Sequence, residues 1–163
     1  MPLSGPTIGV RRIRVLGLAT ALVFAVGVVH SPTARAEDGD RVKLLRLLNE
    51  SRERHDLRTL RPDRSLNRDA MHHTRRMLRR NQIFDPHDLA VMLSDEPWDD
   101  IGASVVGCAS TLKGLHRALL RHGPHRRILL HPKLRRVGIG VVQTRARNVC
   151  RRGWYWATEL YYG

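Results

Sequence analysis

The sequence predicts an α+β protein in which helices and a small sheet pack as separate layers. Two observations lead to this prediction. The first half of the chain shows helical periodicity, and the two clearest strand patterns stand together at the C-terminal end. Helices first and a pair of strands last favour a mixed α+β arrangement over the parallel sheet of repeated βαβ units.

The N-terminus has the pattern of a secretory signal peptide. Three arginines among residues 11–14 precede an apolar run over residues 15–29, and a small-x-small pattern follows at Ala34-Arg35-Ala36. Signal peptides combine these three parts in this order. We therefore expect residues 1–36 to be a signal peptide that is cleaved after Ala36, and residues 37–163 to form the mature protein.

An uncleaved single-span anchor is the alternative, although the apolar run falls short of the roughly 20 residues that a span needs. The Arg11-Arg12 pair leaves twin-arginine export open beside the general secretory route. No later segment is apolar for long enough to cross a membrane. The expected location is therefore outside the cytoplasm, secreted or associated with the cell envelope.

The mature segment is strongly basic and of single-domain length. The chain has 29 basic and 15 acidic residues, and four of the arginines belong to the leader, which leaves a net charge of about +10. Such a surface suits anionic lipids, acidic wall polymers or nucleic acid. It is equally compatible with a solvated surface that binds nothing.

Two helices are expected in the first half of the mature chain. Apolar residues recur at helical spacing over residues 41–55, and a proline-containing turn follows at 59–63. Asp63 or Ser65 can cap a second helix that runs to about residue 80. Its predicted buried stripe consists of Leu66, Ala70, Thr74, Met77 and Leu78.

The second half begins with a long acidic loop over residues 84–100, followed by a short strand at 101–106. Ser110 or Thr111 can cap a third helix, which Gly123-Pro124 should end. A short turn then leads to two strands at 137–143 and 153–161, joined by a polar, basic turn.

The two cysteines, Cys108 and Cys150, are predicted to form a disulfide, because an even count in an exported chain favours pairing. In the loop-entropy description this bond contributes roughly 4 kcal/mol to stability at most. Two separate reduced thiols are the alternative.

Several motifs, in order and spacing, resemble those of one family. Asn49-x-x-Arg52 stands in the first helix, residues 112–129 contain a Gly-Pro-His-Arg stretch followed by Ile-Leu, and Val137-Gly-Ile-Gly-Val141 precedes an aromatic closing strand. Together these resemble the CAP superfamily of cysteine-rich secretory proteins, antigen 5 and pathogenesis-related proteins. The likeness covers about residues 41–161 and implies a CAP-like domain over 37–163, built as an α-β-α sandwich with a small antiparallel sheet.

The resemblance also implies a cleft with two histidines and two acids, which in some members holds a divalent metal. His125 matches the histidine of the Gly-His-Arg pattern, and His87 lies near the position of the first histidine. The usual Gly-Glu-Asn triplet reads Gly102-Ala103-Ser104 here, so its acid is missing, and the second acid has no counterpart. Other cleft candidates are Ser104, Asp99 and Asp100.

With two histidines alone, zinc would need a third ligand and water. We therefore expect no cofactor, with His87 and His125 as the ligands should zinc bind. No complete catalytic set is visible, and a chain without one is more consistent with binding than with an enzyme. The expected function is a monomeric, non-catalytic binding module for a lipid, a sterol-like molecule or a wall or protein partner. No nucleic-acid partner is expected, because aromatic platforms are few.

Two alternatives remain open. One is a metal-dependent hydrolase that uses His87 and His125. The other is an electrostatic binder of polyanions, which should lose affinity steeply with salt.

Overall fold

The structure is a computed structural model that describes residues 32–94, 101–150 and 154–163. Five helices and four strands are described, with the following bounds: α1 Pro32–Glu53, β1 Arg61–Pro62, α2 Arg64–Arg80, α3 Leu89–Met92, β2 Gly102–Ala109, α4 Leu112–Arg121, α5 Gly123–Leu129, β3 Arg136–Gln143 and β4 Tyr155–Tyr162. None of these helices is long and apolar enough to span a membrane.

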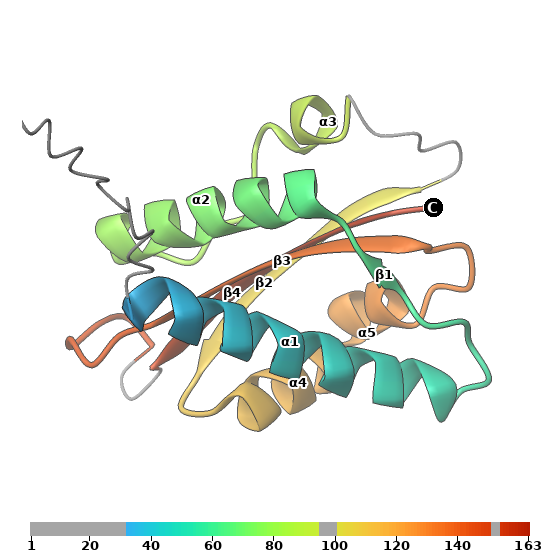
Figure 1. The fold of residues 1–163 in the computed structure, drawn as a ribbon, viewed down its shortest axis with the longest axis horizontal. Coiled ribbons are helices and arrows are strands. Elements are labelled where there is room, and N and C mark those ends of the chain that lie inside the picture. The colour runs from blue at the N-terminus through green and yellow to red at the C-terminus, as the bar shows by residue number, and fades with distance from the viewer. Residues whose placement is uncertain (1–31, 95–100, 151–153) are drawn as a thin grey trace, which may run out of the picture.

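The elements form three layers, as Figure 1 shows. A four-stranded sheet with the order β1-β3-β4-β2 lies in the middle. α2 and α3 cover one face, and α1, α4 and α5 cover the other. The predicted α+β class and the α-β-α layering are thus confirmed. β2, β3 and β4 pair antiparallel as expected, whereas the short β1 pairs parallel with β3, which makes the sheet mixed.

The larger core lies between the sheet and α1, α4 and α5. The strands contribute alternate residues to it, among them Val105, Ile139 and Tyr161. α1 contributes Leu44 and Leu48, which are fully buried at a spacing of four residues. This alternation along strands and helical spacing along α1 is what two-layer packing requires.

The second core lies between the sheet and α2, where two glycines of β3 determine how closely the helix packs. A Cβ on Gly138 would overlap the backbone of Leu66, and a Cβ on Gly140 would overlap the backbone of Ala70. The Val-Gly-Ile-Gly-Val motif therefore allows α2 to lie directly on β3. The residues buried along α2 are Leu66, Ala70, His73, Thr74 and Met77.

The helix caps agree with the sequence patterns and resolve the choices that these left open. The Asp63 carboxylate accepts hydrogen bonds from the backbone N–H groups of Ser65 and Leu66, and so caps α2. Thr111 caps α4 by accepting from Gly114. At the other end of α2, Asn81 adopts the left-handed conformation that ends many helices.

Three local expectations were wrong. The short turn expected after Gly123-Pro124 is the helix α5, because proline is well tolerated in the first turn of a helix. α4 does end before this pair, as expected. The segment expected as a loop contains the one-turn helix α3. Trp154, which falls within the strand expected at 153–161, precedes β4 and is 46% exposed.

Cys108 and Cys150 form a disulfide, as predicted, which joins the end of β2 to the turn before β4. α1 begins at Pro32, which is earlier than the helix start expected at residue 41 and lies upstream of the expected cleavage point. Residues 1–31 lie outside the described residues. The signal peptide over residues 1–36 therefore stays a prediction.

Candidate functional site

The predicted cleft histidines come from segments on both sides of β2, the strand at one edge of the sheet. His87 lies just before α3, and His125 lies in α5. Since α3 and α5 cover opposite faces and both contact β2, the two segments approach the same edge.

His87 is exposed and stacks on Phe84, with ring centroids 6.1 Å apart and an interplanar angle of 13°. The guanidinium groups of Arg76 and Arg80 lie over the same Phe84 ring at 5.8 and 5.5 Å from its centroid. Cation–π contacts of this kind hold two positive charges beside His87. Asp88, the next residue in the chain, faces Arg76, so the surroundings of this imidazole carry charges of both signs.

His125 is half-buried and meets His122 edge to face at 4.4 Å between centroids. Burial lowers the pKa of His125, and His122 lowers it further, while the Asp85 carboxylate acts in the opposite direction. Burial also lowers the pKa of His73, an α2 residue whose Nδ1 lies 3.0 Å from Thr158 Oγ1. Arg76 lowers the pKa of His73 further, and the Asp88 and Asp85 carboxylates act in the opposite direction. This edge thus brings several imidazoles together with the carboxylates of Asp85 and Asp88.

A complete set of metal ligands is not assembled in the described part of the chain. Within it, no group of three His, Cys, Asp or Glu side chains has an arrangement that could hold a metal ion. Asp88 instead faces Arg76, with 3.4 Å between Oδ1 and Nη2. Asp99 and Asp100 lie outside the described residues. Ser104 lies on β2 opposite Leu160, half-buried.

A serine–histidine pair that the sequence patterns did not single out connects α1 to α4. Ser51 Oγ lies 2.7 Å from His116 Nε2 and accepts a hydrogen bond from Arg54 Nη2 at 2.8 Å. Burial, reinforced by Arg54, lowers the pKa of His116 to about 4. An imidazole with so low a pKa is a poor general base near neutral pH. The pair therefore serves better as a buried polar link between helices than as a nucleophile and base.

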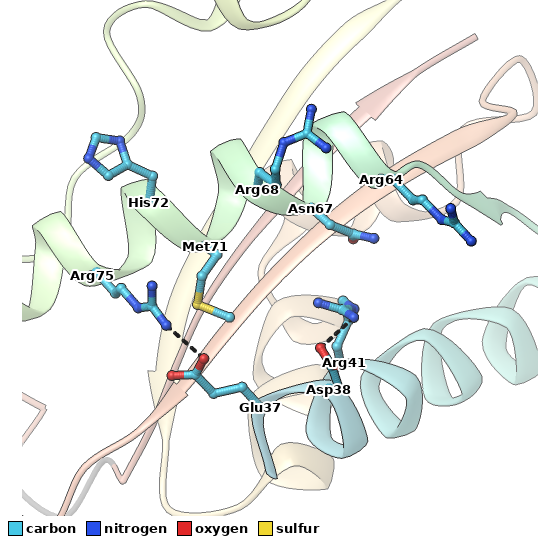
Figure 2. Close-up of a pocket in the computed structure, with 9 residues that line it drawn as sticks. All are labelled: Glu37, Asp38, Arg41, Arg64, Asn67, Arg68, Met71, His72 and Arg75. Carbon is cyan, nitrogen blue, oxygen red and sulfur yellow. Dashed lines mark hydrogen bonds and ion pairs between the residues drawn. The ribbon is translucent and has the colours of Figure 1, made fainter. Parts of the chain in front are cut away.

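The groove between α1 and α2 is a hollow of about 500 Å³, which we call the helix groove. Figure 2 shows Arg75 and Met71 pointing from α2 toward the start of α1, where Glu37 and Arg41 stand. The residues that line it are Glu37, Asp38, Arg41, Arg64, Asn67, Arg68, Met71, His72 and Arg75. Most of its charged side chains are therefore cationic.

The two acids of the helix groove each hold one arginine. Glu37 Oε2 lies 2.7 Å from Arg75 Nη2, and Asp38 Oδ1 lies 2.6 Å from Arg41 Nη2. Arg64 and Arg68 have no acidic partner among the residues described. The groove thus carries two guanidinium groups whose charge is not balanced by a neighbouring carboxylate.

The sequence patterns do not single out this groove. The structure gives the α2 arginines different partners. Arg75 faces Glu37, whereas Arg76 and Arg80 lie over Phe84. The signal was present in the spacing, since Arg64, Arg68 and Arg75 follow one another at intervals of four and seven residues along one helical face.

The three-layer α-β-α fold is that of a CAP-type domain. The sequence model of the cysteine-rich secretory protein (CAP) family matches residues 45–161. The chain belongs to this family. Among curated proteins no match is found.

Solved structures with the same fold share little sequence with this chain. An extracellular SCP-domain protein of Bacillus anthracis matches with a TM-score of 0.65 and 19% identity, over 82% of this chain and 44% of that one. An outer surface protein of Borrelia burgdorferi matches with a TM-score of 0.61 and 13% identity, over 76% of this chain and 92% of that one.

A cysteine-rich secretory protein of Staphylococcus aureus gives a TM-score of 0.58 and 18% identity, over 78% of this chain and 39% of that one. The chain thus spans less than half the length of the Bacillus and Staphylococcus proteins. At these identities the likeness shows the fold alone.

Proposed function

We propose that this chain is an exported binding domain that acts at the cell envelope or outside the cell without turnover, and that its ligand is anionic. The observation that carries the proposal is the helix groove of Figure 2, where Arg64 and Arg68 have no acidic partner in the described ranges. The signal-peptide pattern of the sequence supports export.

The chemistry of the groove suits a carboxylate or phosphate group. A guanidinium presents a planar fork of donors that matches two oxygens of such a group, and it stays charged at any physiological pH. Arg64 and Arg68 stand one helical turn apart, so both can reach one ligand. Met71 and the arginine stems add apolar contact beside the charged groups.

The same observations favour an anion over the lipid or sterol-like ligand that the family resemblance suggested. A sterol site would need a pocket lined predominantly by apolar side chains. The helix groove has one methionine among nine lining residues, of which six are charged. Two further observations give no support to turnover. The pKa of His116 is low, and His87 and His125 are not part of a three-ligand group that could hold a metal among the described residues.

Calorimetric titration of the mature chain with inorganic tripolyphosphate tests the proposal. We expect micromolar binding that weakens steeply as salt rises. The variant Arg64→Ala/Arg68→Ala should bind at least about 10-fold more weakly, which corresponds to about 1.4 kcal/mol. The matched control is Arg145→Ala/Arg147→Ala, which removes the same charge from the exposed turn between β3 and β4.

Equal losses in the two variants would show that only net charge matters, and would overturn a defined site. Salt-independent binding to neutral sterol-containing vesicles, with no response to tripolyphosphate, would replace the anion by an apolar ligand.

A further inference from the structure

A second basic hollow lies at the opposite edge of the sheet from the histidines. It measures about 460 Å³ and is lined by Arg58, Thr59, Arg61, Arg135 and Arg136. We call it the edge pocket. Four of its five lining residues are arginines, and no acid lines it within the described part of the chain.

Backbone pairing holds these arginines together. Arg61 is the parallel partner of Arg136 in the pairing of β1 with β3, and the N–H of Arg61 donates to the carbonyl of Arg135 at 3.0 Å. Arg135 in turn donates through Nη1 to the carbonyl oxygen of Pro132 at 2.7 Å. The cluster is therefore built into the sheet edge and does not depend on flexible loops meeting by chance.

A buried arginine fixes the remaining corner of the edge pocket. Arg52 is fully buried, and its Nε donates to the carbonyl oxygen of Arg58 at 2.8 Å. Its Nη1 donates to the carbonyl oxygen of Leu129 at 2.7 Å. Arg52 thus anchors the backbone of Arg58 and places a further positive charge behind the pocket.

The arginines of the edge pocket are in no ion pair among the described residues, as is also the case for Arg64 and Arg68 of the helix groove. Arginines that do face a carboxylate include Arg41, Arg75 and Arg76. None of the four pocket arginines is among them. Like charges gathered in a concave site repel one another, and an anion would remove that repulsion.

The edge pocket and the helix groove are neighbours along the chain. Arg61 belongs to the pocket, and Arg64 belongs to the groove and begins α2. Three residues span at most about 10 Å of extended chain. Figure 1 shows β1 leading directly into the first turn of α2.

Asp63, the acid between these two arginines, forms its hydrogen bonds with other groups. The Asp63 carboxylate accepts from the backbone N–H groups of Ser65 and Leu66 at 2.9 and 3.3 Å, and from the Tyr162 hydroxyl at 3.0 Å. It is therefore engaged as a helix cap and in a contact with β4. A ligand that extends from the groove to the pocket would not have to pass an unpaired carboxylate at this point.

We propose that the edge pocket is a second anion subsite, and that it and the helix groove bind successive charged groups of one linear phosphate polymer. This inference rests on the proposed function, since it takes the helix groove as the first subsite. Recognition would be of backbone charge alone. No Phe, Tyr or Trp lines either hollow in the described part of the molecule, and His72 of the helix groove is the one aromatic ring among their lining residues, so bases of a nucleic acid would find little to stack on.

Two inorganic probes of different length test the inference on the full mature chain. Tripolyphosphate can occupy one subsite at a time, and calorimetry should show two bound per chain. Long-chain polyphosphate can occupy both, and linking two sites should raise its affinity by at least about 100-fold over tripolyphosphate. The decisive variant is Arg58→Ala/Arg61→Ala, with Arg145→Ala/Arg147→Ala as the control of equal charge.

Arg58→Ala/Arg61→Ala, the edge variant, should bind one tripolyphosphate per chain. It should also lose most of the long-chain advantage, which is the higher affinity for long-chain polyphosphate than for tripolyphosphate. The control variant should still bind two tripolyphosphates and keep this advantage. Circular dichroism checks the fold, and Arg58→Lys/Arg61→Lys is the second variant if the first does not fold. The lysine variant keeps the charge but loses the forked geometry, so a clear reduction of the long-chain advantage is still expected.

Different failures have different meanings. If wild type binds a single tripolyphosphate that is lost in Arg64→Ala/Arg68→Ala, or if the edge variant keeps the full long-chain advantage, the second subsite is wrong and the proposed function stands. Tighter binding of single-stranded DNA than of polyphosphate would overturn the polymer class. If no anion binds to wild type, the proposed function fails as well.

Discussion

The backbone of Gly140 in β3 lies directly against the backbone of Ala70 in α2, so close that a Cβ on Gly140 would overlap Ala70. Thr74 Oγ1, one turn further along α2, donates to the Gly140 carbonyl oxygen at 3.1 Å. This contact between helix and sheet sets the position of α2, and with it the α2 side of the helix groove.

Gly140→Ala should therefore be strongly destabilising, by about 3 kcal/mol or more, because main-chain atoms have little room to move aside. Denaturant unfolding measures the change. Gly107→Ala is the matched control, because its Cβ would meet only the side chains of Leu115 and Leu119, at 3.1 and 3.2 Å. Equal free energies of unfolding for the two variants would contradict this account of how α2 packs.

The disulfide should make a measurable contribution to stability. Cys108 and Cys150 are 42 residues apart in sequence, and both pack against a small cluster of Met77, Val106 and Trp156. Cys108→Ser/Cys150→Ser should lower the free energy of unfolding by up to about 4 kcal/mol. Mass spectrometry of the exported protein should show the two cysteine peptides joined. Two freely alkylated thiols in folded material would contradict the prediction.

Much of the fold could be predicted because its signals are local. Asp63 and Thr111 are helix caps whose residue type and position are visible in the sequence. The strand patterns at residues 137–143 and 153–161 differ from β3 and β4 by only a residue or two at their ends. Capping and alternation depend on neighbouring residues, so no tertiary information is needed to find them.

The remaining features depend on contacts between distant segments. The edge pocket exists because Arg61 pairs with Arg136, which lies far away in the sequence. Likewise Glu159 stands in an ordinary strand pattern, where a charged residue is expected to face solvent. It is instead fully buried, on the same side of the sheet as Tyr161. A polar residue on a core face goes against the pattern from which burial is predicted. Neither feature has a local signal.

The buried acid should make stability depend on pH. Burial raises the pKa of Glu159 to about 7, against the hydrogen bond that it accepts from the Tyr161 hydroxyl. The pKa of a glutamate in the unfolded chain is about 4.5. Between pH 4.5 and 7 the Glu159 carboxyl is therefore protonated in the folded state and ionised in the unfolded state. Its contribution is therefore complete below about pH 4.5 and is lost as pH rises toward about 7, by on the order of 3 kcal/mol.

Glu159→Gln should remove this slope, because an amide keeps the hydrogen bond without titrating. Urea unfolding of wild type and variant between pH 4.5 and 8 measures the difference. The comparison also removes the opposing effect of His116, whose lowered pKa makes stability fall as pH decreases over part of the same range. Parallel stability curves for the two proteins would mean that Glu159 does not titrate in this range.

The edge histidines give the last prediction, which concerns zinc. We expect no stoichiometric zinc at micromolar concentration, and no difference between wild type and His87→Ala/His125→Ala. Two imidazoles need a third ligand and water to hold this ion. Arg76 and Arg80, both over the Phe84 ring on which His87 stacks, also disfavour a divalent cation. Mass spectrometry measures the zinc content of the wild type and the double variant, and competitive titration measures their zinc affinity. One zinc per chain, lost in the double variant, would show that an aspartate such as Asp85 completes a site at this edge. It would also make metal-dependent hydrolysis the better function.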